Sequence, residues 1–238
     1  MALVEKVLVI GGGIAGMCAS IQMRKLGIAV DLVEISREWT AYGAGITISS
    51  PTLRALRTVG VIDEVLARGG NWSAIDICAA DGSVLTTVPV KPSVGAESLP
   101  GAGGIMRPVL AQILSRATRE SGTNVRLGLT FDTLESGADC VNVRFSDGTR
   151  ERYDLVVGAD GVRSKVREAI FPGAPTPFFS GQMSWRAVVP RTRKNSTIFM
   201  GKTTKAGLNP VSASESYLFV LDHQNRVDFV GDRAAGPG

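Results

Sequence analysis

Cysteine and histidine are scarce in this 238-residue sequence, which has three cysteines and a single histidine. Cys18, Cys78 and Cys140 are far apart and form no Cys-x-x-Cys pair, so we expect reduced thiols and no metal site. His223 stands in a polar stretch and is not expected to act in catalysis. No Ser/His/Asp set or pair of carboxylates stands out either, so the sequence leaves the catalytic residues unknown.

Long apolar runs and a strong charge imbalance are also absent. No stretch approaches the about 20 apolar residues that cross a bilayer, and the apolar run at Val7–Ile10 is too short for a signal-peptide core. The net charge is only +4, and lysines and arginines do not alternate with aromatics along a stripe. We therefore expect a cytoplasmic protein without a membrane or nucleic-acid partner.

Glycine is abundant, with 28 residues, and one cluster has a recognisable spacing. Val7–Ile10 is the continuous apolar run of a buried parallel strand, and a helical pattern follows until Gly27. Between them, Gly11-Gly12-Gly13-Ile14-Ala15-Gly16 fits the pattern G-x-G-x-x-G. In this pattern the first glycine allows a tight turn, the second lets the backbone touch a pyrophosphate, and the third lets helix and strand pack closely. The amides of Ile14 and Ala15 then open a helix whose dipole favours phosphate.

A second strand follows over residues 28–34 and ends in Glu34, close to the about 20-residue spacing at which an acid accepts hydrogen bonds from a ribose. The alternative is a glycine-rich turn without a ligand, but the combination of strand, turn, helix and acid favours a dinucleotide with a free ribose. The motif alone does not separate FAD from NAD.

The rest of the chain predicts a mixed α/β fold. Helices are expected to begin near Pro51 and Pro108, separated by a hairpin around Asp81-Gly82 and by a glycine-rich loop over 95–104. Alternating residues over 140–145, a turn at Asp147-Gly148 and a buried strand over 155–157 come next. Strands then dominate, including 183–189 and 217–221. We expect a Rossmann-like domain with a parallel sheet, joined to a second, sheet-rich region.

The segment from Asp154 to Arg167, DLVVGADGVRSKVR, is the most informative stretch. It reads as a strand, a turn at Asp160-Gly161 and a short helix beginning near Ser164. This segment closely resembles the Asp-Gly motif of the flavoprotein aromatic hydroxylases, a family that includes 4-hydroxybenzoate and salicylate hydroxylases. The resemblance implies that Asp160 and Gly161 lie near the FAD pyrophosphate and take part in NAD(P)H use, with Arg167 as a weaker candidate.

Other segments are similar to the same family. Gly43-Ala44-Gly45-Ile46 is similar to the loop that approaches the flavin ring, which implies that role for Gly45 and Ile46. Arg107 matches an arginine that reaches the cofactor from a helix start, although it could be a surface charge. The strand around Phe131 is similar to one whose backbone meets the adenine. Residues 184–190 and 217–220 are similar to strands of the substrate domain, so Arg186 and Tyr217 are candidate substrate contacts, with structural roles in the sheet as the alternative.

The resemblance implies an FAD-binding domain over 1–175, with an inserted hairpin around 73–100 that belongs to the substrate region, and a partial substrate domain over 176–223. The tail 224–238 departs from the family pattern, and Val230-Gly231-Asp232 is interpreted as a chance match to a later Gly-Asp motif. The chain is therefore expected to lack the C-terminal part of the family, which would uncover a sheet edge for self-association.

The implied function is an FAD-dependent, NAD(P)H-using monooxygenase that acts on a small aromatic compound with O2. In such enzymes the cofactor carries the chemistry, which agrees with the absence of an evident catalytic acid or base. An NAD-linked dehydrogenase would have no reason to carry the Asp160-Gly161 segment. A flavin-dependent halogenase would carry paired tryptophans, and only Trp185 stands in that region. The remaining alternative is a catalytically idle FAD-binding fragment, or a subunit that needs a partner.

Overall fold

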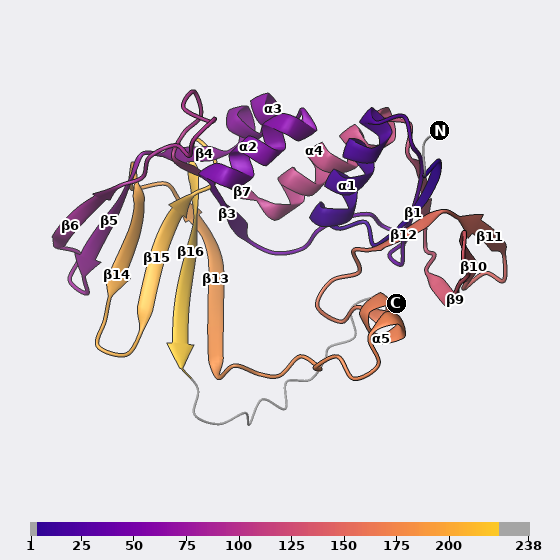
Figure 1. Cartoon of the computed structure of the whole chain (residues 1–238). Coiled ribbons are helices and arrows are strands. Elements are labelled where there is room, and N and C mark those ends of the chain that lie inside the picture. The colour runs from indigo at the N-terminus through magenta and orange to yellow at the C-terminus, as the bar shows by residue number, and fades with distance from the viewer. Residues whose placement is uncertain (1–3, 224–238) are drawn as a thin grey trace.

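The computed structural model describes residues 4–223, and the part that contains β1 is built on a parallel sheet (Figure 1). The strand order is β12-β1-β2-β8. The strands are β1 (Lys6–Ile10), β2 (Ala29–Glu34), β8 (Asn124–Leu127) and β12 (Leu155–Gly158). Val7 to Ile10 are at most 1% exposed, which confirms the predicted buried strand. The prediction of a buried strand over 155–157 is wrong, because β12 is an edge strand with one neighbour and Leu155 is 44% exposed.

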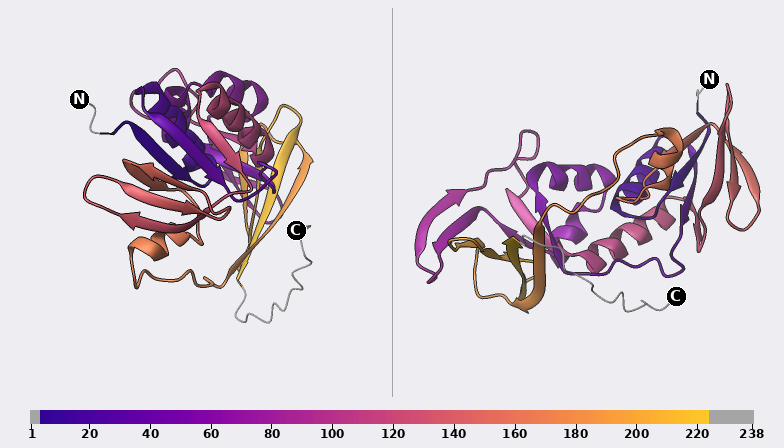
Figure 2. Two further views of the ribbon diagram at one scale, coloured as in Figure 1. Left: turned by 90° about the vertical axis from the view of Figure 1, so that its right-hand side faces the viewer. Right: turned by 90° about the horizontal axis from the view of Figure 1, so that it is seen from below.

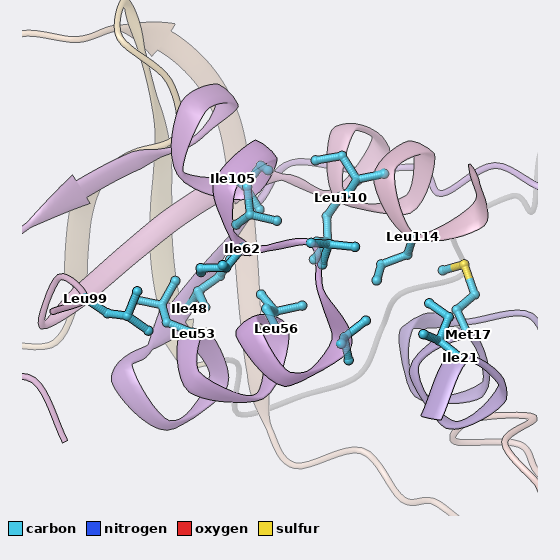
Figure 3. Packing of buried hydrophobic residues seen from close by; sticks show 14 of the residues in the cluster. Met17, Ile21, Ile48, Leu53, Leu56, Ile62, Leu99, Ile105, Leu110 and Leu114 are labelled. Atoms are coloured by element: carbon cyan, nitrogen blue, oxygen red, sulfur yellow. The ribbon is translucent and has the colours of Figure 1, made fainter. Parts of the chain in front are cut away.

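The helices pack against one another over a common apolar core. They are α1 (Ile14–Lys25), α2 (Ser50–Val59), α3 (Ile62–Arg68) and α4 (Arg107–Glu120), whereas α5 (Lys165–Ile170) contributes Val166 to a separate core. Side chains such as Met17, Leu53, Ile62 and Leu114 from the first four helices meet in this core, as Figure 3 shows. The prolines at the starts of α2 and α4 confirm the two predicted helix starts, whereas the short α3 was not predicted.

A three-stranded antiparallel sheet packs beside the parallel sheet. Its order is β11-β10-β9, with β9 (Phe131–Ser136), β10 (Val141–Phe145) and β11 (Arg150–Tyr153). Phe131, Phe145 and Tyr153 share a core with Leu8 of β1. The Tyr153 hydroxyl donates to Asp31 Oδ2 over 2.7 Å, and burial raises the pKa of Tyr153, so this hydroxyl stays a donor at neutral pH. The hydrogen bond joins the two sheets.

A small sheet connects the helical layer to the rest of the molecule. Its order is β3-β7-β4, with β3 (Gly45–Ser49), β4 (Gly70–Trp72) and β7 (Ala102–Met106). The expectation of a loop over 95–104 is wrong at its end, where Gly103 and Gly104 belong to β7. A Cβ on Gly104 would lie 2.4 Å from the carbonyl oxygen of Pro210, so this glycine serves close packing within a strand.

The C-terminal strands form a six-stranded sheet at one end of the molecule (Figures 1 and 2). Its order is β13-β16-β15-β14-β5-β6. The strands are β5 (Ala74–Ala79), β6 (Val84–Pro89), β13 (Gln182–Pro190), β14 (Ser196–Met200), β15 (Lys205–Pro210) and β16 (Glu215–His223). The β5–β6 hairpin confirms the predicted turn at Asp81-Gly82 and joins the later strands through a parallel pairing of β5 with β14. The fold is thus the expected α/β class, with a parallel sheet and a sheet-rich second region.

Candidate functional site

The turn between β1 and α1 depends on glycines in two places where a side chain would collide with backbone. Gly11 has φ +110°, and a Cβ there would lie 2.4 Å from the carbonyl oxygen of Ala159. A Cβ on Gly16 would lie 1.9 Å from the carbonyl oxygen of Gly11, so this glycine lets α1 pack on the turn. Gly13 differs, because a Cβ there would meet nothing within 4 Å. The middle glycine of the motif therefore faces open space, where the motif requires room for a pyrophosphate.

The first turn of α1 adds electrostatics that suit an anion. Ile14 and Ala15 are exposed there, and this turn contains no acidic residue. Because the first amides of a helix lack intrahelical partners and carry the positive end of the dipole, they favour phosphate oxygens.

Glu34 and Trp39 hold the glycine-rich turn from the side of β2. The Gly12 amide donates to Glu34 Oε2 over 2.7 Å, and the Ser36 amide donates to Glu34 Oε1 over 2.9 Å. The Trp39 indole N–H donates to the Gly12 carbonyl over 2.7 Å. Each carboxylate oxygen keeps a further lone pair, so Glu34 can accept from a ribose while it holds the turn. The sequence reasoning missed Trp39, which belongs to no motif.

The Asp160-Gly161 turn lies beside the glycine-rich turn because β1 and β12 are parallel neighbours in register. Ile10 pairs with Gly158, and the Ala159 amide donates to the Ile10 carbonyl over 2.7 Å. Gly161 has φ +84°, and a Cβ there would meet nothing within 4 Å. Two turns that are far apart in sequence therefore present open backbone to the same space.

Asp160 organises the start of α5. Its Oδ1 accepts from the Ser164 hydroxyl over 2.5 Å, and its Oδ2 accepts from the Val166 amide over 3.1 Å. Ser164 in turn caps the helix by accepting from the Arg167 amide. Arg167 donates through a guanidinium N–H to the Val162 carbonyl over 3.0 Å, which keeps its side chain on the turn.

A cavity of 380 Å³ lies between these elements. Its lining includes Gly11, Gly13, Glu34, Asp160 and Gly161, so the structure brings together five of the residues selected from the sequence. Its charged lining residues are two carboxylates, Glu34 and Asp160, and two cations, Arg163 and Lys165. That charge arrangement fits a dinucleotide, whose hydroxyl groups would meet the carboxylate and whose phosphates would meet amides and cations. Arg163 and Lys165 belong to the segment from Asp154 to Arg167, whose pattern alone assigns them no role.

Phe131 itself does not face the cavity. Its side chain is 8% exposed in the core between the parallel and three-stranded sheets, and the adjacent Thr130 lines the cavity. Only the backbone of this segment was proposed to meet the adenine, and the position of Thr130 is compatible with that proposal.

Gly45, Ile46 and Arg107 lie together where the start of β3 pairs with the end of β7, beside the start of α4. Gly45 pairs with Met106 across β3 and β7, and the Arg107 amide donates to the Ala44 carbonyl over 3.4 Å. The Arg107 Nε is buried and has no hydrogen-bond partner among the described residues, which leaves a donor for an oxygen of a ligand. Ile46 is half-buried and packs against the helical core.

Tyr217 and Arg186 lie on the same face of the six-stranded sheet but in different environments. Tyr217 is 7% exposed, packs on Gly45 and hydrogen-bonds Thr47 Oγ1 over 3.0 Å through its hydroxyl. Arg186 is exposed on the edge strand β13, where its Nε donates to Ser184 Oγ over 3.3 Å. Tyr217 is therefore part of the interface between the two regions, and Arg186 is not.

Residues 4–223 were compared with the requirements of a metal site and of a membrane-spanning helix. No group of three or more His, Cys, Asp or Glu side chains there could hold a metal ion. No helix in that part is long and apolar enough to span a bilayer. The Val230-Gly231-Asp232 match and the tail 224–238 lie outside the described residues.

Comparison with known proteins agrees with the dinucleotide geometry. Residues 5–229 match the family model described as "FAD binding domain". The chain is 35% identical over 216 residues to the 2-heptyl-3-hydroxy-4(1H)-quinolone synthase of Pseudomonas aeruginosa, covering 90% of this chain and 55% of that protein. It is 32% identical over 220 residues to the aurachin C monooxygenase/isomerase of Stigmatella aurantiaca, covering 90% of this chain and 56% of that protein.

A solved structure has the same arrangement. The Klebsiella pneumoniae HpxO structure, complexed with FAD and uric acid, aligns with a TM-score of 0.81 and 26% identity, over 92% of this chain and 57% of that chain. The chain thus spans little more than half the length of the relatives and structures that it matches.

Proposed function

Because this chain belongs to the FAD-binding-domain family, we propose that it is the cofactor-binding and substrate-facing part of an FAD-dependent, NAD(P)H-using monooxygenase. The reaction would convert an aromatic or heteroaromatic ring C–H to C–OH. One oxygen atom of O2 would enter the product and the other would leave as water, with NAD(P)H and one proton consumed. The observation that carries this proposal is the cavity where the glycine-rich and Asp160-Gly161 turns meet.

The redox chemistry would be supplied by bound FAD, and the roles of the protein are to bind, orient and exclude water. In this proposal the open backbone at Gly13 and the first amides of α1 hold the pyrophosphate, and Glu34 accepts from a ribose. The Nε of Arg107, which has no partner among the described residues, and the backbone at Gly45 would contact the flavin.

The substrate would lie between the flavin end of the site and the six-stranded sheet. The family relatives support this class of substrate by name, since one is a synthase of a hydroxylated quinolone and another is FAD-dependent urate hydroxylase of Klebsiella oxytoca. Tyr217 is the better placed of the two candidate substrate contacts, because it borders Gly45.

We keep the division into an FAD-binding domain over 1–175 and a substrate region over 176–223 as part of this proposal. The pairing of β5 with β14 supports assigning the inserted hairpin around 73–100 to the substrate region. The edge strands β6 and β13 carry exposed apolar side chains, including Leu85, Val188 and Trp185. We propose that the chain self-associates through such an edge, and sedimentation at several protein concentrations would test this.

The first experiment measures FAD binding by the absorption spectrum of the purified chain after FAD addition and gel filtration. The variant Gly13→Ala fills the open space at the middle glycine, and we expect at least a ~10-fold loss of FAD affinity with unchanged stability. Gly137→Ala is the matched control, because Gly137 is exposed in the β9–β10 turn and a Cβ there makes only an ordinary contact. A wild-type chain that binds no FAD, or a Gly13→Ala chain that binds it normally, would contradict the proposed site.

A second measurement separates a monooxygenase from an idle FAD-binding fragment. The FAD-loaded chain is mixed with NADH or NADPH and a panel of aromatic compounds, and product formation is followed by mass spectrometry in 18O2. Incorporation of one labelled oxygen supports the enzyme. FAD binding without ring-dependent NAD(P)H consumption favours the alternative, a fragment or subunit that needs a partner.

A further inference from the structure

A second cavity, of 470 Å³, lies between β3, the start of α2 and one face of the six-stranded sheet. The strand register defines this face. Ile198 pairs with Gly207, which pairs with Phe219, and Asn209 pairs with Tyr217, so Ile198, Asn209, Phe219 and Tyr217 share a face. Thr47 also lines the cavity and lies two residues after Gly45 on β3. The cavity therefore begins about 7 Å from the proposed flavin loop.

The shape of this cavity comes from a large side chain beside a glycine. A Cβ on Gly207 would lie 2.4 Å from the ring of Phe219, so this ring covers the backbone of β15. The ring, Ile198 and Ile75 give the sheet side of the cavity an apolar wall, and Trp72 contributes to the opposite side. A cavity of this volume is within the usual range for small-molecule sites, about 300–1,000 Å³.

The polar groups of the lining are uncharged and mostly bonded to one another. Ser50 and Ser93 share a hydrogen bond of 3.0 Å, and Asn209 accepts from Ser196 and donates to Thr47 Oγ1 over 3.2 Å. Lys91 is the single charged residue that the described part of the chain contributes to the lining, and it is exposed. The hydroxyl groups keep lone pairs for a neutral donor, but the buried lining residues within 4–223 offer no cation to a carboxylate.

We propose that this cavity selects an uncharged bicyclic heteroaromatic ring, such as a 4-quinolone, over the corresponding ring carboxylate. The proposal rests on the proposed function and narrows its substrate class. A carboxylate that entered the cavity would lose its water without gaining an ion pair, whereas the ring of a neutral ligand gains apolar contact. The N–H and C=O groups of a quinolone can exchange hydrogen bonds with the hydroxyls and the amide of the lining.

Arg186 is the feature that could favour an acid instead. It pairs with Phe219 across β13 and β16 and lies on the same face of the sheet. Its side chain is exposed, turns toward Ser184 and does not line the cavity. We therefore expect Arg186→Gln to leave the selectivity unchanged, which makes it a control for the proposal.

The test compares 2-methyl-4(1H)-quinolone with 4-oxo-1H-quinoline-2-carboxylate, which differ only in replacing the methyl group by a carboxylate. Calorimetric titration of each into the chain, with and without saturating FAD, should give an affinity at least ~10-fold higher for the methyl compound. Ile198→Arg places a cation in the half-buried wall and should reverse the preference. Ile75→Arg provides the same charge from β5 if the first variant fails to fold, and circular dichroism checks both.

The outcomes separate the selectivity of this cavity from FAD binding by the chain. Preference for the carboxylate by an FAD-loaded chain, a loss of selectivity in Arg186→Gln, or binding of neither compound up to its solubility limit would overturn the inference and leave FAD binding intact. A chain that binds no FAD contradicts the proposed function, while its selectivity measured without FAD still tests the cavity.

Discussion

The glycine-rich turn forms the cofactor end of the proposed site, and the cavity-lining face of the six-stranded sheet forms its substrate end. Different contacts hold these two regions in shape. At the turn, backbone lies against backbone, and Gly11 and Gly16 leave no room for a side chain. At the sheet, side chains make the contacts, with Tyr217, Asn209 and Thr47 bonded to one another across the two regions. Backbone groups are the same in every residue, whereas side chains can change without moving the strands. The first region is therefore suited to an invariant cofactor and the second to a particular substrate.

Gly11→Ala should have the largest effect, because it disrupts the close contact between the backbones of the two turns. The new Cβ would lie 2.4 Å from the Ala159 carbonyl, at a φ of +110° that L-residues rarely adopt. We expect the free energy of unfolding to fall by about 3 kcal/mol or more, measured by urea denaturation. Gly137→Ala should change it by less than about 1 kcal/mol. Equal effects of the two substitutions would show that the two turns are not packed as described.

Tyr217→Phe tests the side-chain contacts of the second region. The substitution removes the hydroxyl that accepts from Asn209 over 3.0 Å and bonds Thr47, but it keeps the ring on Gly45. We expect a loss of about 1–2 kcal/mol in unfolding free energy. FAD affinity should be unchanged, because no atom of the first cavity moves.

Tyr42→Phe is the matched control for that variant. Tyr42 is 81% exposed, and its hydroxyl makes one long contact of 3.4 Å with Glu38. Its loss should cost less than about 0.5 kcal/mol. Similar losses in both variants would mean that the buried network adds nothing beyond an exposed hydroxyl.

The difference between local patterns and contacts of distant segments explains how much the sequence could predict. Strand β1, the glycine-rich turn and the hairpin at Asp81-Gly82 are local patterns, so spacing was enough to place them. The meeting of Gly11 with Ala159 depends on the parallel pairing of β1 with β12, which residue spacing alone does not specify. The resemblance supplied the second turn, and the structure then showed that both turns line one cavity.

In both regions, burial and contacts between distant segments were harder to predict, for a physical reason. Burial in a strand depends on which neighbours cover it, so Leu155 was assigned to a buried strand and lies at an exposed edge. Asn209 and Thr47 line a cavity only because β15 and β3 face each other, and neither residue belongs to a motif. Their role could have been suspected from a polar Asn within an apolar strand pattern, but their partners could not.

Trp39→Phe should affect stability less than Gly11→Ala or Tyr217→Phe, and it separates the contribution of this turn to FAD binding from its contribution to folding. The phenyl ring keeps most of the packing against α1 and β2, but the hydrogen bond of 2.7 Å to the Gly12 carbonyl is lost. One neutral hydrogen bond contributes about 0.5–1.5 kcal/mol, so the melting temperature should fall by only a few degrees. The Gly12 carbonyl then loses its side-chain donor and Glu34 holds only the Gly12 amide, so we expect FAD affinity to fall ~3–10-fold. Trp185→Phe is the matched control, because Trp185 is 60% exposed on the six-stranded sheet and should leave both quantities unchanged. If Trp39→Phe lowers the melting temperature without weakening FAD binding, Trp39 is a packing residue and the turn is fixed by its glycines and Glu34.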